Sequence, residues 1–131
     1  MKIISIKETC LYIKDLNLAI DFYHEKLKFP LISHVKGKHA FFRVGAAILL
    51  VFNPEESKLK ESPPSHYASG KQHIAFEVKP EDYERSKNDI TNLGIRITDK
   101  ITWGSGQESF YFEDPVGNVL EIVPYGVWEN G

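Results

Sequence analysis

The sequence contains little cysteine: Cys10 is the single one in 131 residues. One thiol cannot form a disulfide within the chain, and it cannot build a zinc site of several cysteines. Any metal site in this chain must therefore be made of histidine and carboxylate side chains.

Long apolar runs are also lacking. The longest, residues 44–52, falls well short of the roughly 20 residues that a membrane-spanning helix needs. The apolar part of residues 1–8 is too short for the core of a secretory signal peptide. We therefore expect a soluble protein located in the cytoplasm.

An excess of either charge is missing as well. Lys and Arg number 16 against 18 Asp and Glu, which gives a formal net charge of −2 without any long basic run. Nucleic acids and anionic membranes attract proteins with a basic patch, so neither is expected as a partner. The length and the hydrophobic content of 42% are typical of one globular domain with an ordinary core.

Two halves of the chain predict the same order of elements: a strand, a helix and three further strands. In the first half, Asp15 or Asn17 is the expected cap of the helix. In the second half, Pro80 begins the helix and Gly94 ends it. The predicted strands are residues 10–13, 29–35, 39–44, 46–52, 73–78, 95–101, 109–113 and 119–123.

The repeated order predicts an α+β fold of two βαβββ modules in a single domain, residues 1–131. The modules are residues 4–53 and 72–124, and residues 54–71 form a polar linker rich in Pro and Ser. Its composition is typical either of a mobile tether or of a lid over a site. Alignment of the modules places Glu8 opposite His73, 65 positions apart (73 − 8).

Alternation along the strands predicts where three unusual residues point. Apolar residues such as Leu11, Phe76 and Ile122 share the faces that the helices should cover. Glu8, His73 and Glu121 take the opposite faces. Two carboxylates and an imidazole on an otherwise apolar surface are costly unless they bind something in common, and a divalent cation would serve.

Three stretches carry a resemblance to a known family. They are "DLNLAIDFYHEKLKFPL" after the first strand, "HIAFEV" at the start of the second module and "FYFEDPVGNVLEIV" near the end. Together with the doubled βαβββ order, they resemble the vicinal oxygen chelate superfamily. That superfamily includes glyoxalase I, extradiol ring-cleaving dioxygenases, fosfomycin-resistance enzymes and bleomycin-binding proteins. The resemblance covers nearly the whole chain and implies a half-open, curled, glyoxalase-like sheet.

The resemblance also implies a metal site. Matched by position with the metal ligands of the family, the ligands in this chain are Glu8, His73 and Glu121. The family's remaining ligand position, on the last strand of the first module, is occupied by Leu49 or Leu50, neither of which can bind a metal. Three protein ligands leave room for water or substrate, as in catalytic sites. One imidazole and two carboxylates favour one divalent ion of manganese, iron or nickel, with zinc allowed.

By the same resemblance, the protein is expected to be a metal-dependent enzyme that chelates two oxygens of a small, oxygen-rich molecule. Ring-cleaving dioxygenases of the family use two histidines and one carboxylate, so Glu8 favours a lyase, isomerase or transferase. The usual further carboxylate of glyoxalase I is absent, and Cys10 stands where fosfomycin thiol transferases usually have threonine. The alternative is a non-catalytic binding protein of the bleomycin-resistance type. Family members are usually homodimers, and we expect one here.

Several further residues have two interpretations. Glu8 and Glu77 are either site residues or solvated strand-end acids, and Cys10 is either a substrate contact or a small buried residue. Cys10 and Glu77 are thus weak candidates for catalytic residues. Four aromatic residues are expected in the core or along the cleft, and three residues of loops or linker are expected at the surface. The first set is Phe42, Phe52, Trp103 and Tyr111, and the second is His39, His66 and Tyr67.

Overall fold

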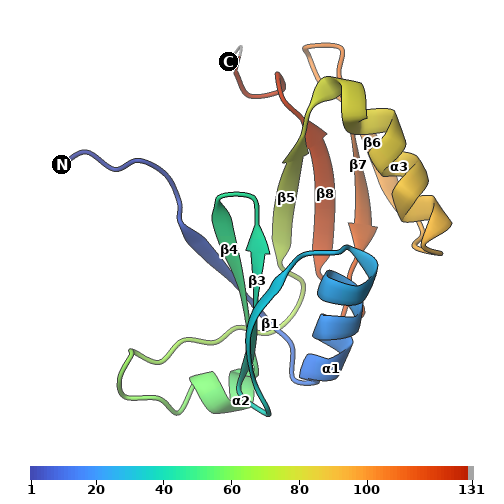
Figure 1. Cartoon of the computed structure of the whole chain (residues 1–131). Helices are drawn as coiled ribbons and strands as arrows, with labels where there is room; N and C mark the ends of the chain where they lie inside the picture. Colours follow the sequence, from blue (N-terminus) through green and yellow to red (C-terminus); the bar gives the residue numbers. More distant parts are fainter. Residues whose placement is uncertain (130–131) are drawn as a thin grey trace. The chain divides into compact units, whose positions relative to one another are not determined.

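The computed structural model describes residues 1–129, which form two compact units, residues 1–69 and the chain from residue 70 onward. Each contains one four-stranded sheet (Figure 1).

The first unit follows the predicted order of a strand, a helix and three strands. It also contains a short helix, α2, that the sequence did not predict. The elements are β1 (Glu8–Tyr12), α1 (Leu16–Ala19), a π-helical turn (Ile20–Lys26), β2 (Leu31–Val35), β3 (His39–Val44), β4 (Ala47–Phe52) and α2 (Pro54–Ser57).

The second unit repeats this order. Strand β6 is shorter than the predicted strand of residues 95–101, and it does not include residues 95–98. The elements are β5 (His73–Val78), a 3₁₀ turn (Pro80–Asp82), α3 (Tyr83–Asn92), β6 (Asp99–Thr102), β7 (Glu108–Glu113) and β8 (Val119–Pro124).

The two sheets have the same topology. Their strand orders are β1-β4-β3-β2 and β5-β8-β7-β6, and in each the first strand pairs in parallel with the last. The other neighbours are antiparallel. This confirms the α+β, glyoxalase-like fold of two βαβββ modules. The single domain with a linker at residues 54–71 stays a prediction.

Each unit has its core between its sheet and its helix. In the first, the ring of the fully buried Tyr23 lies 5.7 Å from that of Phe42 on β3. Asp15 caps α1, because its carboxylate accepts a hydrogen bond from the backbone N–H of Asn17 at 3.1 Å. Leu11 and Ile13 are buried on this side, as their alternation predicted.

In the second unit, α3 lies along one face of its sheet (Figure 1). The ring of Tyr83 on α3 lies 5.6 Å from that of Phe110 on β7, and Phe112 and Leu120 are fully buried on the same face. The backbone at Gly94, just beyond α3, has a φ of +78°, which glycine adopts without strain. His73 and Glu121 therefore point to the opposite face, as predicted.

The segment after β4 corrects the sequence interpretation. Residues 54–57 form α2 in place of structureless linker, and Asn53 caps this helix by accepting from the N–H of Glu55. Pro54 at the first helical position favours the helix start, because its φ suits a helix and its missing N–H is not needed there. Ser57 is fully buried, so the first part of the linker is attached to its unit.

Residues 1–7 precede β1 without regular structure, and this N-terminal arm extends away from the strand (Figure 1). Ile3, Ile4 and Ile6 expose 78%, 99% and 85% of their surface. Within residues 1–129, no helix has the length and apolarity that a membrane crossing requires.

Candidate functional site

His73 stands at the start of β5 with its ring held in one orientation. Its Nδ1 lies 2.9 Å from the backbone carbonyl oxygen of Val119, on the neighbouring strand β8. A carbonyl oxygen only accepts hydrogen bonds, so Nδ1 carries the proton and donates. The other ring nitrogen, Nε2, is therefore the one available to a ligand, and metal-binding histidines are commonly oriented this way.

Glu121 on β8 is the partner of His73. Its Oε1 lies 3.3 Å from His73 Nε2, and its side chain is only 8% exposed while that of His73 is 51% exposed. The strand pairing places Glu121 opposite Ala75, so its carboxylate reaches diagonally toward His73. A carboxylate with so little exposure is stable as an anion only beside hydrogen-bond donors or a cation, and a metal ion bound to His73 Nε2 would be such a cation.

The pair fits a divalent metal ion. Two donor atoms bound at about 2.0–2.1 Å to one ion lie about 2.8–3.0 Å apart at octahedral angles and about 3.3–3.4 Å apart at tetrahedral angles. The 3.3 Å between Glu121 Oε1 and His73 Nε2 matches the tetrahedral separation. An imidazole nitrogen and a carboxylate oxygen suit zinc, manganese, iron and nickel.

Glu8 belongs to the first unit and is exposed at the start of β1. It pairs with Ile48 as His73 pairs with Val119, so Leu50 corresponds to Glu121. The strand register thus decides between Leu49 and Leu50, which the sequence left open. Within either unit, over residues 1–129, no three His, Cys, Asp or Glu side chains gather as metal ligands. The role of Glu8 as the third ligand stays a prediction.

Tyr111 on β7 lies on the same face of the sheet as Glu121. The sequence had not decided whether Tyr111 belongs to the core or to the cleft. It pairs with Glu121, and its ring centroid lies 6.1 Å from that of His73. Burial raises the pKa of the Tyr111 hydroxyl, and the negative charge of Glu121 adds to the rise. The hydroxyl is therefore neutral near pH 7 and can donate a hydrogen bond. Alternation with the buried Phe110 and Phe112 on β7 is the sequence signal for this orientation.

The two weak catalytic candidates differ in their surroundings. Burial raises the pKa of the Cys10 thiol, a hydrogen bond with Tyr12 opposes the rise, and the charge of Glu8 adds to it. A raised pKa leaves less of the nucleophilic thiolate at neutral pH. Glu77 is exposed on β5 and pairs with Val123, two residues beyond Glu121. Catalytic roles for Cys10 and Glu77 stay predictions.

Two histidines expected at the surface are partly buried. His39 opens β3, and its ring stacks on that of Phe41 at a centroid distance of 3.9 Å. His66, in the linker, has its Nδ1 2.7 Å from the hydroxyl oxygen of Tyr12 on β1. Sequence reasoning missed His66 because this contact joins residues 54 positions apart. The third residue, Tyr67, is 65% exposed, as expected.

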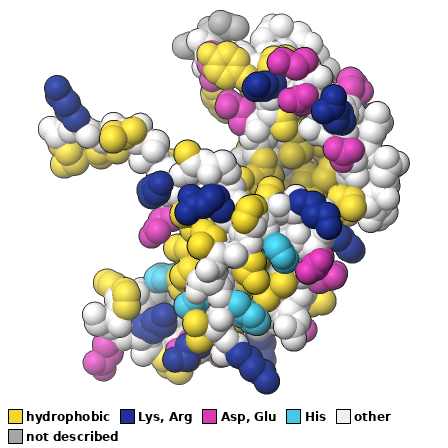
Figure 2. All heavy atoms as spheres, viewed as in Figure 1, with side chains coloured by type: hydrophobic (Ala, Val, Ile, Leu, Met, Phe, Trp, Pro, Cys, Tyr) yellow, Lys and Arg dark blue, Asp and Glu magenta, His cyan; other side chains and the backbone are white. Residues whose placement is uncertain are grey.

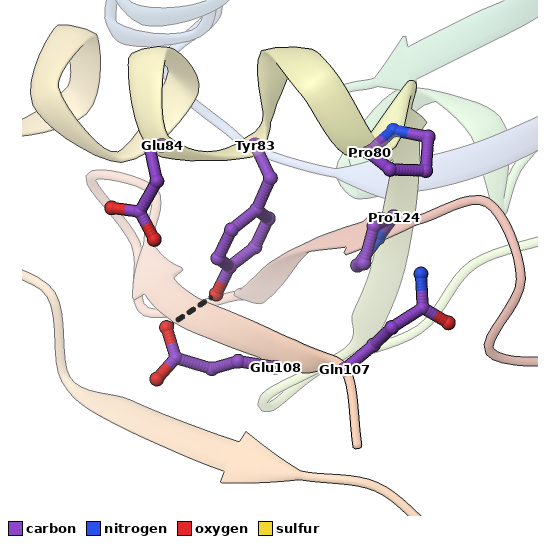
Figure 3. A pocket seen from close by; sticks show the side chains of 6 residues that line it. All are labelled: Pro80, Tyr83, Glu84, Gln107, Glu108 and Pro124. Atoms are coloured by element: carbon purple, nitrogen blue, oxygen red, sulfur yellow. Dashed lines mark hydrogen bonds between the residues drawn. The ribbon is translucent and has the colours of Figure 1, made fainter. Parts of the chain in front are cut away.

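A surface pocket lies elsewhere in the second unit (Figure 3). Glu108 lines it, but its Oε2 already accepts from the Tyr83 hydroxyl at 2.8 Å and from Lys87 Nζ at 2.6 Å. Glu108 alternates with Tyr111 along β7, so the pocket lies on the helix-covered face, opposite to His73 and Glu121. The six lining residues are Pro80, Tyr83, Glu84, Gln107, Glu108 and Pro124.

Glu108 gives a prediction about stability. The Lys87 ammonium, followed by the Tyr83 hydroxyl, lowers the pKa of Glu108, so the stabilisation is present above the ordinary carboxyl pKa and is lost as the pH falls through the lowered one. Glu108→Gln should therefore cost about 1 kcal/mol at pH 7, an amount reduced by partial exposure, and the cost should shrink as the pH falls below the ordinary carboxyl pKa. Urea unfolding across this range measures it. Glu113 lies on the same strand as Glu108 and forms an exposed ion pair with Lys71. Glu113→Gln removes that pair and should change the free energy of unfolding little.

Comparison with protein families shows which family has this fold. A family model described as "Glyoxalase/Bleomycin resistance protein/Dioxygenase superfamily" matches residues 5–122. The chain belongs to this superfamily. The resemblance inferred from the sequence is thereby confirmed.

Similar members of the superfamily are of comparable length. The chain is 28% identical to metallothiol transferase FosB of Staphylococcus epidermidis over 127 residues, which cover 93% of this chain and 82% of that protein. It is 30% identical to glutathione transferase FosA of Serratia marcescens over 125 residues, covering 90% and 79%. A crystal structure of lactoylglutathione lyase from Agrobacterium tumefaciens is 30% identical, with a TM-score of 0.90 and coverage of 95% and 96%.

Proposed function

We propose that this protein is a metal-dependent enzyme that acts on a small, oxygen-rich molecule. One observation carries the proposal: the oriented Nε2 of His73 lies 3.3 Å from the buried carboxylate of Glu121, a separation suited to one shared cation. Glu8, as the third ligand, would leave the remaining coordination positions to water or substrate. A bound divalent ion would polarise two neighbouring substrate oxygens and stabilise the negative charge that develops on them.

The residues around the pair have separate tasks in this proposal. The carbonyl of Val119 holds His73 in the tautomer that presents Nε2. The neutral hydroxyl of Tyr111 donates a hydrogen bond to the Glu121 carboxylate and so helps to hold it beside His73. The low exposure of Glu121 keeps water from competing for its carboxylate.

The type of reaction is proposed from the relatives. Those named above are called a metallothiol transferase, a glutathione transferase and a lactoylglutathione lyase. These names favour a lyase or a thiol transferase over a ring-cleaving dioxygenase. The ligand set agrees, because two carboxylates and one imidazole differ from the two histidines and one carboxylate typical of non-haem iron oxygenases.

Leu50 favours a second candidate, a non-catalytic protein that binds a small molecule. It occupies the position equivalent to Glu121 in the first unit, and its apolar side chain cannot hold a metal. An apolar surface suits sequestration of a ligand. Homodimer formation and location in the cytoplasm also stay predictions.

Metal titration separates the two functions. Metal-free protein should bind one equivalent of Mn²⁺, Ni²⁺, Zn²⁺ or Fe²⁺, and the affinity should fall in acid because protons compete for the histidine nitrogen. His73→Ala should weaken binding at least a hundredfold, whereas the exposed His34→Ala on β2 should not change it. The enzyme hypothesis is supported if the protein binds one equivalent of metal and turns over a member of a panel of thiol conjugates, epoxides and 2-oxoaldehydes. Equal metal binding by parent and His73→Ala contradicts it.

A further inference from the structure

The open face of the first sheet continues beyond Glu8 into a group of aromatic side chains. Tyr12 lies four residues along β1 from Glu8, about 13 Å at the usual rise per residue. The pairing register places Tyr12, Phe52 and His39 side by side on β1, β4 and β3. The aromatic cluster is defined as Tyr12, His39, Phe41, Phe52 and His66.

Phe52 is the centre of the aromatic cluster. Its ring centroid lies 4.6 Å from that of His66 and 5.3 Å from that of Phe41, both edge to face. Phe52 itself is 7% exposed, whereas the four other rings are each partly exposed. The aromatic cluster therefore offers ring faces and edges to a ligand while its base is packed.

The linker folds back onto the aromatic cluster and brings nitrogen groups to it. The backbone N–H groups of Lys60 and His66 both point to the carbonyl oxygen of the buried Ser57, at 3.4 Å. Lys60 Nζ lies 5.6 Å from the Phe52 ring centroid. Figure 2 shows histidine and lysine side chains gathered over the part of the first unit around α2.

Lysine side chains lie beside the aromatic cluster, and one of them, Lys38, is paired with Glu56, whose Oε1 lies 3.9 Å from its Nζ. Burial lowers the pKa of His39, and the neighbouring Lys60, His34 and Lys38 lower it further because they disfavour another cation. The Nε2 of His39 lies 3.0 Å from Ser33 Oγ, whereas its buried Nδ1 has no hydrogen-bond partner among residues 1–129. Such surroundings repel a cationic ligand and attract an anionic one.

We propose that the aromatic cluster is a subsite for an aromatic anion: its planar ring packs against the partly exposed rings of Tyr12 and Phe41, and its anionic group lies at Lys60. Tyr12 and His66, joined by their hydrogen bond, leave one further donor at the same end, an N–H or an O–H according to the tautomer of His66. The inference rests on the proposed function in one respect, that the same substrate spans the distance of about 13 Å along β1 from Glu8, the proposed metal ligand, to Tyr12.

Binding of small probes to the metal-free full chain tests the subsite. We expect benzoate to shift the NMR signals of the aromatic cluster with a Kd on the order of 1 mM, as its few atoms allow. Cyclohexanecarboxylate, which has the charge without the aromatic ring, should bind at least fivefold more weakly. Benzyl alcohol, which has the ring without the charge, should do the same. Equal binding of the three, or shifts outside the aromatic cluster only, would overturn the proposal.

A pair of lysines provides the matched variants. Lys60→Gln should weaken benzoate binding at least fivefold, whereas Lys58→Gln, two residues away and paired with Glu55 at 2.8 Å, should leave it unchanged. Equal weakening by both would indicate a diffuse charge effect and overturn the subsite. Because no metal is present, benzoate binding should persist in Glu8→Leu. If the proposed metal site is wrong, the metal affinity of Glu8→Leu should instead equal that of the parent.

Discussion

Replacing Glu8 by leucine should abolish high-affinity metal binding and leave the chain folded. Glu8 is exposed in the first unit, at the start of β1, so its carboxylate contributes little to the core of that unit. Loss of one of three protein ligands should lower metal affinity at least a thousandfold, because leucine offers no donor atom. Glu8→Gln keeps one oxygen donor but loses the charge, so its affinity should fall less. Isothermal titration with each divalent ion measures both.

Two controls make this test specific. Glu77→Leu removes an exposed glutamate from β5 and should bind metal as the parent does. Thermal unfolding of the metal-free variants should show that Glu8→Leu is as stable as the parent or slightly more so, because a negative charge that repels other carboxylates is removed. If Glu8→Leu binds metal like the parent, Glu8 is only a strand-end acid and the proposed ligand set is wrong.

Replacing Phe110 by alanine should destabilise the protein by about 3–5 kcal/mol, a large part of the stability of an ordinary domain. Phe110 is fully buried on β7, and its ring packs against Tyr83 and Phe112 at centroid distances of 5.6 and 6.0 Å. The missing ring leaves a cavity that these neighbours cannot fill. Calorimetry should record a melting temperature lower by about 10 °C or more.

Phe42→Ala in the first unit is the matched variant, because Phe42 is also fully buried between its sheet and Tyr23. If the chain is one cooperative domain, both variants should lower the same single transition. Two transitions, each sensitive to one variant only, would contradict the single domain. Tyr125→Ala, which removes a ring that is 55% exposed, should change the melting temperature little.

Local sequence patterns were sufficient to predict the elements of the fold. Alternating apolar residues predicted β5 at residues 73–78, where the structure has it, and Pro80 and Gly94 correctly marked the limits of the following helical segment. These signals are local, because side-chain direction, the φ of proline and the φ of glycine depend on a few neighbouring residues. The repeat of the same elements then predicted two βαβββ modules.

Part of the candidate site was also determined by sequence. The spacing predicted that His73 and Glu121 share one face of their sheet, and the structure brings their donor atoms to 3.3 Å. The prediction was possible because alternation along a strand decides the face. The sequence could not predict the hydrogen bond from His73 to the Val119 carbonyl, because that bond depends on which strands are neighbours.

The tertiary structure alone decided the register and the path of the linker. Leu50, and not Leu49, shares the face of Glu8 because β1 pairs with β4 in one register, and a shift of one residue would exchange the faces. The linker, whose composition is typical of a mobile tether or of a lid, places Lys60 and His66 beside the ring of Phe52. Such contacts join segments distant in sequence, and their free energy comes from burial and hydrogen bonds that form only after the sheet is assembled.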